Sequence, residues 1–300
     1  MLHDQSAIEV LTLTNGADRC DLIPAVGGSI AAWSVGGEAM MRSASSASLG
    51  AQDPFGMASF PLVPYSNRID NGSFEWHGQR FRLARNFYPE PHAIHGVGFE
   101  KPWQVQTRAA DSATLVLKHR PCAAWPFAFE AQQRITLGAG ALTLELSAVN
   151  LAAHAAPLAF GHHPYFPREG AWLKFRAQNV WLVGDDGLPS LRVKPFGKFD
   201  YAYGTPVTRG DIDHCFTDWD GAAEVSWPDK LLALEIQASA SLRCAVVCIR
   251  SDVDGFCFEP VPHLNDALNR SDRAHAMPVI EPGKSFNACI RFRAAPRAPG

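Results

Sequence analysis

Glu259 is the residue whose surroundings most strongly indicate chemistry. It ends the short, otherwise apolar run 256–259, Phe-Cys-Phe-Glu, although a carboxylate is costly to remove from water. In an extended strand the two phenylalanines would face the core, while Cys257 and Glu259 would project from the opposite face. Such a strand would hold a catalytic base rigidly, and partial burial would raise the pKa of Glu259 toward working pH. The alternative is a structural ion pair with an arginine, Arg68 or Arg250.

A histidine with matching chemistry lies in the aromatic segment 160–166, Phe-Gly-His-His-Pro-Tyr-Phe. Because imidazole exchanges protons near neutral pH, His163 suits the acid of an acid–base pair. If the segment is extended, the neighbouring His162 points to the opposite face, so only one of the two can face a given site. A hydrogen-bonded core histidine is the alternative for His163.

His92 and His95 are three residues apart in the segment 91–98, Pro-His-Ala-Ile-His-Gly-Val-Gly. That spacing can bind a metal on a helix, but the proline and the two glycines indicate a loop. We expect a loop histidine that donates to substrate oxygens, and His95 is the better candidate. The following Gly96 would let the backbone and the substrate approach closely.

Three further polar residues complete the candidate site. Arg68 follows Asn67, and its guanidinium offers fixed donors that suit sugar hydroxyls or a developing oxyanion. Asp213 can accept hydrogen bonds from two adjacent hydroxyls. The structural alternatives are a solvated Arg68 that pairs with Asp70 and an Asp213 that caps a turn.

The elements that must position these residues are short β-strands. Alternating residues and turn sequences predict three hairpins, with strands at 73–76 and 79–83, 133–137 and 142–148, and 244–250 and 256–259. Helical periodicity is scarce, and short turns are expected only near 266–269 and 43–47. The 24 glycines and 22 prolines supply turns for many short strands. We therefore predict an all-β fold, one large antiparallel β-sandwich formed by residues 1–300 as a single domain.

The composition excludes several classes of protein. With 47% hydrophobic and 19% charged residues, the chain is typical of a globular protein, and one or two aromatic residues, such as Trp103 or Phe166, are available to stack on a sugar ring. The formal net charge of -3 argues against nucleic acid or an anionic membrane as a partner. No apolar run is long enough to span a membrane, and residues 1–5 show no signal-peptide pattern. Seven scattered cysteines indicate free thiols in a reducing cytosol, so we expect a cytoplasmic protein.

The order of these motifs resembles the aldose 1-epimerase (galactose mutarotase) family. The resemblance covers nearly the whole chain, through short motifs at 26–30, 66–74, 95–99, 163–166, 213–216, 255–259 and 281–286. Each motif is short, but their joint order and spacing are specific. The resemblance implies a large antiparallel β supersandwich, in agreement with the strand pattern. It also implies interconversion of the α and β anomers of a free sugar.

Carried over residue by residue, the resemblance implies that Glu259 takes the proton from the anomeric hydroxyl while His163 protonates the ring oxygen. The ring opens, the C1–C2 bond rotates, and the ring recloses on its other face. The positions that hold and polarise the sugar are matched by Asn67, Arg68, His95 and Asp213. Glu281 is expected to be a turn residue. Acid and base contributions of about 10²–10⁴-fold each, together with orientation, make a cofactor or a metal unnecessary.

The chain also departs from the pattern of the family. At 162–167 it has His-His-Pro-Tyr-Phe-Pro, whereas members with galactose activity resemble Asn-His-Ser-Tyr-Phe-Asn, so the preferred sugar stays open. The N-terminal stretch of hexose-6-phosphate epimerases is absent and basic residues do not cluster, which favours an unphosphorylated monosaccharide. Both a monomer and a homodimer are compatible with the sequence.

Two other functions are compatible with the same residues. A carbohydrate-binding or sensing protein on the same sandwich would keep Arg68, His95 and the aromatic residues, without needing Glu259 and His163 together. A metal-dependent isomerase or hydrolase would instead use four histidines, His92, His95, His162 and His163.

Overall fold

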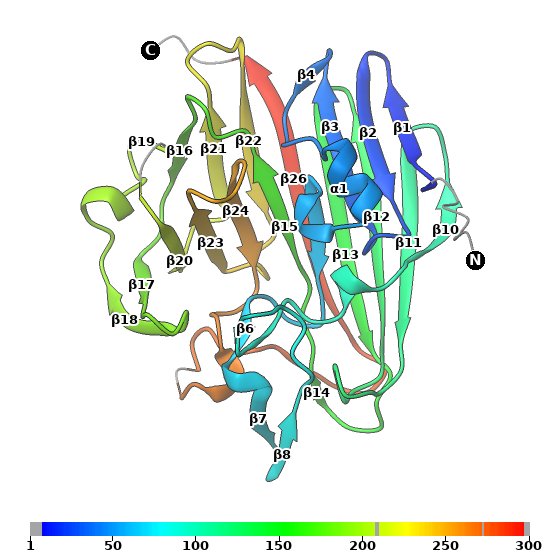
Figure 1. Ribbon diagram of the computed structural model, residues 1–300, viewed down its shortest axis with the longest axis vertical. Helices are drawn as coiled ribbons and strands as arrows, with labels where there is room; N and C mark the ends of the chain where they lie inside the picture. The colour runs from blue at the N-terminus through cyan, green and yellow to red at the C-terminus, as the bar shows by residue number, and fades with distance from the viewer. Residues whose placement is uncertain (1–7, 208–209, 272, 297–300) are drawn as a thin grey trace.

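The computed structural model describes residues 8–207, 210–271 and 273–296, and its regular structure is almost entirely β (Figure 1). Residues 1–5, considered above for a signal peptide, lie outside the described part. The described residues include one short α-helix, α1 (Ser46–Ala51), and 3₁₀ turns at Pro54–Gly56, Asp70–Gly72, Gly98–Glu100, Gly197–Phe199 and Ala267–Asn269. Helix α1 begins later than the predicted 43–47, because the Ser45 side chain accepts a hydrogen bond from the Ser48 amide and caps the helix there.

Two large antiparallel sheets form the sandwich. Within the described residues the first has 11 strands, in the order β1 (Leu11–Asn15), β2 (Asp18–Ile23), β3 (Ser29–Val35), β5 (Ser59–Leu62), β15 (Gly161–Phe166), β24 (Phe256–Val261), β23 (Cys244–Ile249), β20 (Ile212–Thr217), β17 (Asn179–Val183) and β18 (Pro189–Val193), with β4 (Glu38–Ala39) paired to β3. The second has 9 strands, in the order β10 (Gln104–Arg108), β11 (Ser112–His119), β12 (Phe129–Gly138), β13 (Ala141–Asn150), β26 (Ser285–Pro296), β22 (Leu232–Ala238), β21 (Ala222–Ser226), β16 (Trp172–Phe175) and β19 (Thr205–Pro206).

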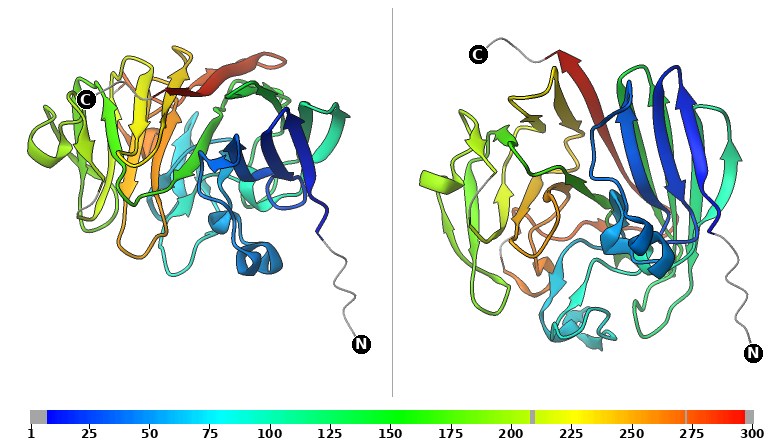
Figure 2. Two further views of the ribbon diagram at one scale, coloured as in Figure 1. Left: turned by 90° about the horizontal axis from the view of Figure 1, so that it is seen from above. Right: turned by 45° about the horizontal axis from the view of Figure 1, so that its top comes forward.

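Both sheets extend across the molecule, from β1 and β10 at one side to β18 and β19 at the other (Figures 1 and 2). Three two-stranded ribbons accompany them: β6 (Arg68–Ile69) with β9 (Ala93–Ile94), β7 (Ser73–Trp76) with β8 (Gln79–Arg82), and β14 (Ala156–Pro157) with β25 (Val279–Ile280). This architecture confirms the predicted all-β supersandwich.

The three predicted hairpins are all present. They are β7–β8, β12–β13 and β23–β24, each paired in antiparallel register. In the first, His77 and Gly78 have φ of 51° and 76°, as a two-residue turn with positive φ at both positions requires. These strands formed as predicted because hairpin pairing is set by local sequence.

Alternation along β24 separates a core face from a site face. Phe256 and Phe258 are fully buried in the main core, which includes residues of both sheets. Cys257 belongs to a second apolar cluster on the opposite face, with Phe60 and Tyr165. Burying an aromatic side chain contributes about 1.5–3 kcal/mol, so the core holds the strand that carries the candidate base.

Residues of the segment 63–103 pack over the outer face of the first sheet, where His95 contacts the ring of His163 on β15 and Phe99 contacts that of Phe60 on β5. This covering explains why all 6 positions of β15 are buried, although a strand with one solvated face would alternate. No helix of the described residues is long and apolar enough to cross a membrane. All seven cysteines are free thiols, as predicted.

Candidate active site

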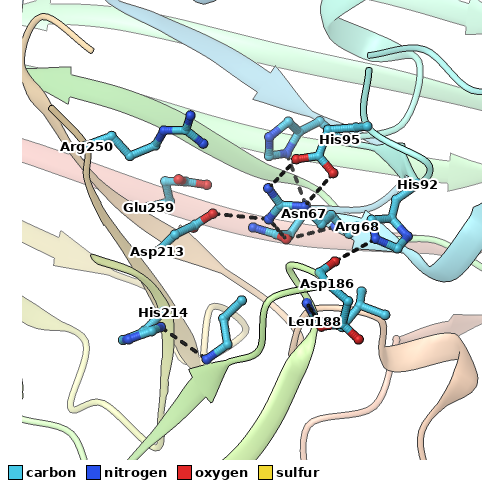
Figure 3. Close-up of polar contacts among 12 residues, drawn as sticks. Asn67, Arg68, His92, His95, Asp186, Leu188, Asp213, His214, Arg250 and Glu259 are labelled. Carbon is cyan, nitrogen blue, oxygen red and sulfur yellow. Dashed lines mark hydrogen bonds and ion pairs between the residues drawn. The ribbon is translucent and has the colours of Figure 1, made fainter. Parts of the chain in front are cut away.

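A cavity of about 410 Å³ opens over the outer face of the first sheet, beside β15 and β24. This volume lies within the roughly 300–1,000 Å³ of small-molecule sites. The residues predicted for the site all line the cavity: Asn67, Arg68, His95, His163, Asp213 and Glu259. The fold thus brings together side chains that are far apart in the sequence, most of which are visible in Figure 3.

Glu259 projects from β24 and is almost fully buried. Burial raises the pKa of its carboxyl well above the usual 4.5, and the neighbouring Cys248 and Asp213 add to the rise. Arg250 pairs with Asp252 at 2.8 Å instead of with Glu259. Since none of the described arginines pairs with Glu259, the alternative of a structural ion pair with arginine is wrong.

His163 lies on β15, the strand that pairs with β24. The pairing joins Tyr165 to Cys257, and continuing this antiparallel register places His163 opposite Glu259. The imidazole stacks on Phe60 and Tyr165, with ring centroids 4.5 and 4.7 Å away. Its burial lowers the pKa of His163 to about 3. Strand pairing sets the place of this ring, and the two aromatic contacts set its orientation.

The two groups are in direct contact, with His163 Nε2 and Glu259 Oε1 3.2 Å apart. Burial lowers the pKa of the imidazole and raises that of the carboxyl, so the empty site favours an uncharged pair with the proton on the carboxyl. Moving one proton along this contact converts it into the ion pair. The pair can therefore present an acid and a base to two neighbouring oxygens of one substrate.

His95 is a neutral donor beside this pair. The Asn67 amide N–H donates to His95 Nδ1 at 3.1 Å, so Nε2 carries the ring proton. Burial lowers the pKa of His95 well below 6.5, which keeps the ring uncharged. The next residue, Gly96, has a φ of 73°, and a Cβ there would lie 2.3 Å from the Val63 carbonyl oxygen. Gly96 thus lets the backbone of Val63 approach closely, as expected, and the close approach of substrate stays a prediction.

Arg68 joins two carboxylates at the wall of the cavity (Figure 3). Its Nη2 and Nε donate to Glu90 at 2.8 and 3.3 Å, and its Nη1 donates to Asp213 at 3.1 Å. The alternative of a solvated Arg68 that pairs with Asp70 is wrong, because Arg68 is buried and pairs with Glu90 and Asp213. Hydrogen bonding from Arg68 lowers the pKa of Glu90 and keeps that carboxylate charged. Asp213 also lines the cavity, with 27% of its side chain exposed, so its free oxygen can accept from a substrate hydroxyl.

Arg42 is a rim residue that sequence reasoning missed. Its guanidinium donates to the carbonyl oxygens of Phe55, Met57 and Asp254 and lies 3.8 Å from the centroid of the Tyr165 ring. It therefore ties three segments together above the aromatic residue that contacts His163. Because its partners are backbone carbonyls, no side-chain motif in the sequence could have indicated it.

The aromatic residues at the cavity also differ from those expected. Phe55 and Phe87 line the cavity with ring centroids 4.8 Å apart, and Phe87 is 36% exposed. Trp103 and Phe166, which were expected to be available for stacking, lie in the main core instead. The sequence does not distinguish an aromatic residue that lines a cavity from one that packs in the core, because no pattern of neighbouring polar residues marks either.

The model of the aldose 1-epimerase family matches residues 9–293 of the chain. The chain belongs to the aldose 1-epimerase family. YphB, an uncharacterized protein of Escherichia coli K12, is 28% identical over 253 residues, which is 78% of this chain and 82% of YphB.

Solved structures with the same fold support the supersandwich assignment. A galactose mutarotase-like protein from Clostridium acetobutylicum has a TM-score of 0.86 at 19% identity, covering 96% of this chain and 95% of that one. A galactose 1-epimerase from Lactobacillus acidophilus has a TM-score of 0.77 at 17% identity, again over 96% and 95% of the two chains. At these identities the likeness concerns the fold alone.

Two of the histidines considered for this member of the aldose 1-epimerase family do not line the cavity. His162 points to the opposite face of β15, as predicted, where it contacts Ser59 and Gln133 in the interior. His92 accepts from the Asn71 amide at 3.0 Å and donates to the Asp186 carbonyl oxygen at 2.8 Å. Both rings are hydrogen-bonded structural residues, so the four-histidine metal site is wrong.

A different trio could hold a metal ion. Among the described residues, ligand atoms of His163, Cys257 and Glu259 lie within 4.8 Å of one another. A thiol must lose its proton to bind a metal, but burial raises the pKa of Cys257 well above 9.0. These three residues are therefore poorly suited to bind a cation. Glu259 and His163 also already contact each other as the candidate acid–base pair.

Proposed function

We propose that the protein is an aldose 1-epimerase that interconverts the α and β anomers of a free, unphosphorylated aldose. The observation that carries the proposal is the 3.2 Å contact between His163 Nε2 and Glu259 Oε1 at the wall of a cavity of about 410 Å³. In a cyclic sugar the anomeric oxygen and the ring oxygen are bonded to the same carbon. Two adjacent proton-transfer atoms suit two oxygens in that relationship.

Ring opening uses the form in which His163 carries the proton and Glu259 does not. Glu259 takes the proton of the anomeric hydroxyl, the bond between C1 and the ring oxygen breaks, and His163 protonates that oxygen. After rotation about C1–C2, the same transfers run in reverse and close the ring on its other face. No electrons are exchanged and no covalent intermediate is needed. General acid and base catalysis contribute about 10²–10⁴-fold each.

The surrounding residues supply hydrogen bonds that orient the ring. His95 Nε2–H donates into the cavity because its Nδ1 is occupied by the Asn67 amide. Asp213 accepts from a hydroxyl while Arg68 holds its other side. Asn67 lines the same wall. We assign these four residues to binding and polarising the sugar.

The charges of the cavity favour a neutral sugar over a sugar phosphate. A phosphate site presents arginines or lysines with free donors, but here each arginine of the lining is engaged: Arg42 by carbonyls, Arg68 by Glu90 and Asp213, and Arg250 by Asp252. Four aspartates also line the cavity, Asp53, Asp213, Asp252 and Asp254. A dianionic group would meet cations that are already engaged and carboxylates that repel it.

Polarimetry tests the proposal. Freshly dissolved α-anomers of aldohexoses, 6-deoxy sugars and pentoses should reach equilibrium rotation faster with the protein, and Glu259→Gln should abolish the effect. The matched control is Glu281→Gln, because Glu281 is an exposed residue whose carbonyl accepts from the Lys284 amide in a turn. If wild type and Glu259→Gln both leave every sugar at the solvent rate while sugars still bind, the chain is a carbohydrate-binding protein and the enzyme proposal fails.

The free thiols also support a reducing compartment such as the cytosol. We therefore place the reaction in the cytoplasm, on a monosaccharide that has already entered the cell.

A further inference from the structure

Two cysteines face each other beside the acid–base pair. Cys248 on β23 is directly opposite Cys257 on β24 in the antiparallel register. Cys257 and Glu259 project from the same face of β24, because Phe256 and Phe258 occupy the other. Cys257 is fully buried, whereas Cys248 is partly exposed and lines the cavity. One thiol is thus reachable from the site, and its partner lies beneath the site.

The backbone already has the spacing that a disulfide needs. Directly opposed residues in antiparallel strands have Cα atoms about 4.5–5.5 Å apart. A disulfide requires roughly 4.4–6.8 Å between Cα atoms. A bond between their sulfurs would therefore need movement of side chains without movement of strands.

Another thiol pair lies nearby and serves as a comparison. Cys215 on β20 is opposite Val246, and Cys244 on β23 is opposite Thr217, so the two cysteines are diagonal neighbours. Diagonal Cα atoms lie about 7–8 Å apart, beyond the usual range for a disulfide. Both side chains are fully buried and neither lines the cavity. An oxidant in the cavity would reach only the first pair.

We propose that Cys248 and Cys257 form a redox-sensitive dithiol, in which hydrogen peroxide produces a disulfide that slows the reaction at Glu259 and His163. The effect on rate depends on the function proposed above, whereas the formation of the bond does not. Ligand atoms of Cys257, His163 and Glu259 lie within 4.8 Å of one another. Drawing the Cys257 sulfur to a bond length of about 2.05 Å from Cys248 shifts an atom that lies within 4.8 Å of the acid–base pair.

The chemistry proceeds in two steps. The Cys248 thiolate attacks one oxygen of peroxide, the O–O bond breaks, and the departing hydroxide takes a proton to become water. The Cys257 sulfur then attacks the resulting sulfenic acid, the S–O bond breaks, and a second water leaves with the proton of Cys257. Two thiols lose two electrons, and the peroxide accepts them.

Peptide mass spectrometry under non-reducing conditions tests the bond directly. The full-length protein, treated with hydrogen peroxide and then alkylated, should yield a linked peptide pair that contains Cys248 and Cys257 and has lost two hydrogen atoms. Dithiothreitol should restore the separate peptides. Cys248→Ser and Cys257→Ser should each abolish the linkage, whereas Cys122→Ser, at an exposed thiol away from the cavity, should retain it.

Polarimetry of the same samples tests the consequence. We expect oxidation to lower the mutarotation rate by at least about tenfold, since a displacement near 1 Å in an active site costs up to about 10², and dithiothreitol to reverse the loss. In Cys248→Ser and Cys257→Ser, peroxide should not change the mutarotation rate that each variant shows before treatment. An absent linkage, or a linkage between Cys215 and Cys244 instead, overturns the assignment. A linkage that leaves the rate unchanged overturns the regulatory effect, and a linkage in a protein without mutarotase activity refutes only the proposed function.

Discussion

Glu259 Oε1 contacts His163 Nε2 at 3.2 Å, while Glu259 Oε2 and His163 Nδ1 have no hydrogen-bond partner among the described residues. Buried polar atoms are normally satisfied, and an unsatisfied group costs about 1–3 kcal/mol. Here two such atoms occur in one contact pair at a cavity. Both atoms are positioned to hydrogen-bond with oxygens of a ligand in the cavity.

The first prediction concerns stability. The pKa of Glu259 is higher in the folded protein than the usual 4.5. A carboxyl of this kind favours folding in its protonated form, so its cost begins above the unfolded pKa and grows as pH rises toward the folded pKa. Glu259→Gln removes the cost and should raise the melting temperature more at pH 7 than at pH 4. Calorimetry on the two proteins measures the difference, and an equal or lower melting temperature at pH 7 would contradict the assigned burial effect.

The second prediction concerns the pH dependence of kcat/KM. Catalysis needs the pair to hold one proton. A second proton adds only when pH falls toward the lowered pKa of His163, about 3, and the last proton leaves only above the raised pKa of Glu259. The profile should be bell-shaped, with apparent values that belong to the pair, and activity should persist at pH 5. An acid limb near 6.5 would indicate an ordinary, solvated histidine.

A third prediction addresses Glu90, which sequence reasoning did not place in the site. Its two oxygens bind Arg68 at 2.8 and 3.3 Å. Losing a charged hydrogen bond costs about 1.5–3 kcal/mol, so Glu90→Gln should loosen Arg68 and raise KM about tenfold, with a smaller change in kcat. Glu75→Gln, at an exposed position of β7, provides the control. A Glu90→Gln enzyme with unchanged KM would show that Arg68 is held well enough by Asp213.

A fourth prediction separates the two loop histidines. His95 lines the cavity and His92 joins Asn71 to the Asp186 carbonyl. His95→Ala should lower kcat/KM at least tenfold, because it removes a donor at the site. His92→Ala should lower the free energy of unfolding by about 2 kcal/mol through two lost hydrogen bonds, with a smaller effect on kcat/KM. Urea titration measures the free energy of unfolding of both variants, and polarimetry measures their kcat/KM. A loss of stability in His95→Ala together with a loss of kcat/KM in His92→Ala would reject these roles.

A fifth prediction concerns metals. The acid–base chemistry assigned here runs without a cation, so extensive treatment with a chelator should leave mutarotation unchanged. Zinc added in excess should either have no effect or inhibit, since it would compete for His163 and Glu259. Activity that disappears with the chelator and returns with zinc would instead support a metal enzyme built on the group that includes Cys257.

The sequence predicted the fold well because hairpins depend on neighbouring residues. Their residue types and surroundings also indicated Glu259 and His163 as the candidate acid–base pair, and both residues line the cavity. Their 3.2 Å contact could not be derived from either motif, because it arises from the pairing of β15 with β24. Glu90 and Arg42 were missed for a related reason: one binds an arginine distant in sequence, and the other binds only backbone oxygens.

The acid–base pair sits on paired strands, whereas Arg42, Phe55 and Phe87 reach the cavity from connecting segments. Strand positions are constrained by the sheet and by the core beneath it, but connecting segments tolerate replacement and insertion. Under the proposed function, natural variation at these positions would change the preferred sugar while the candidate acid–base pair stays unaltered. Engineering a new preference should begin with libraries at these peripheral positions and leave β15 and β24 untouched.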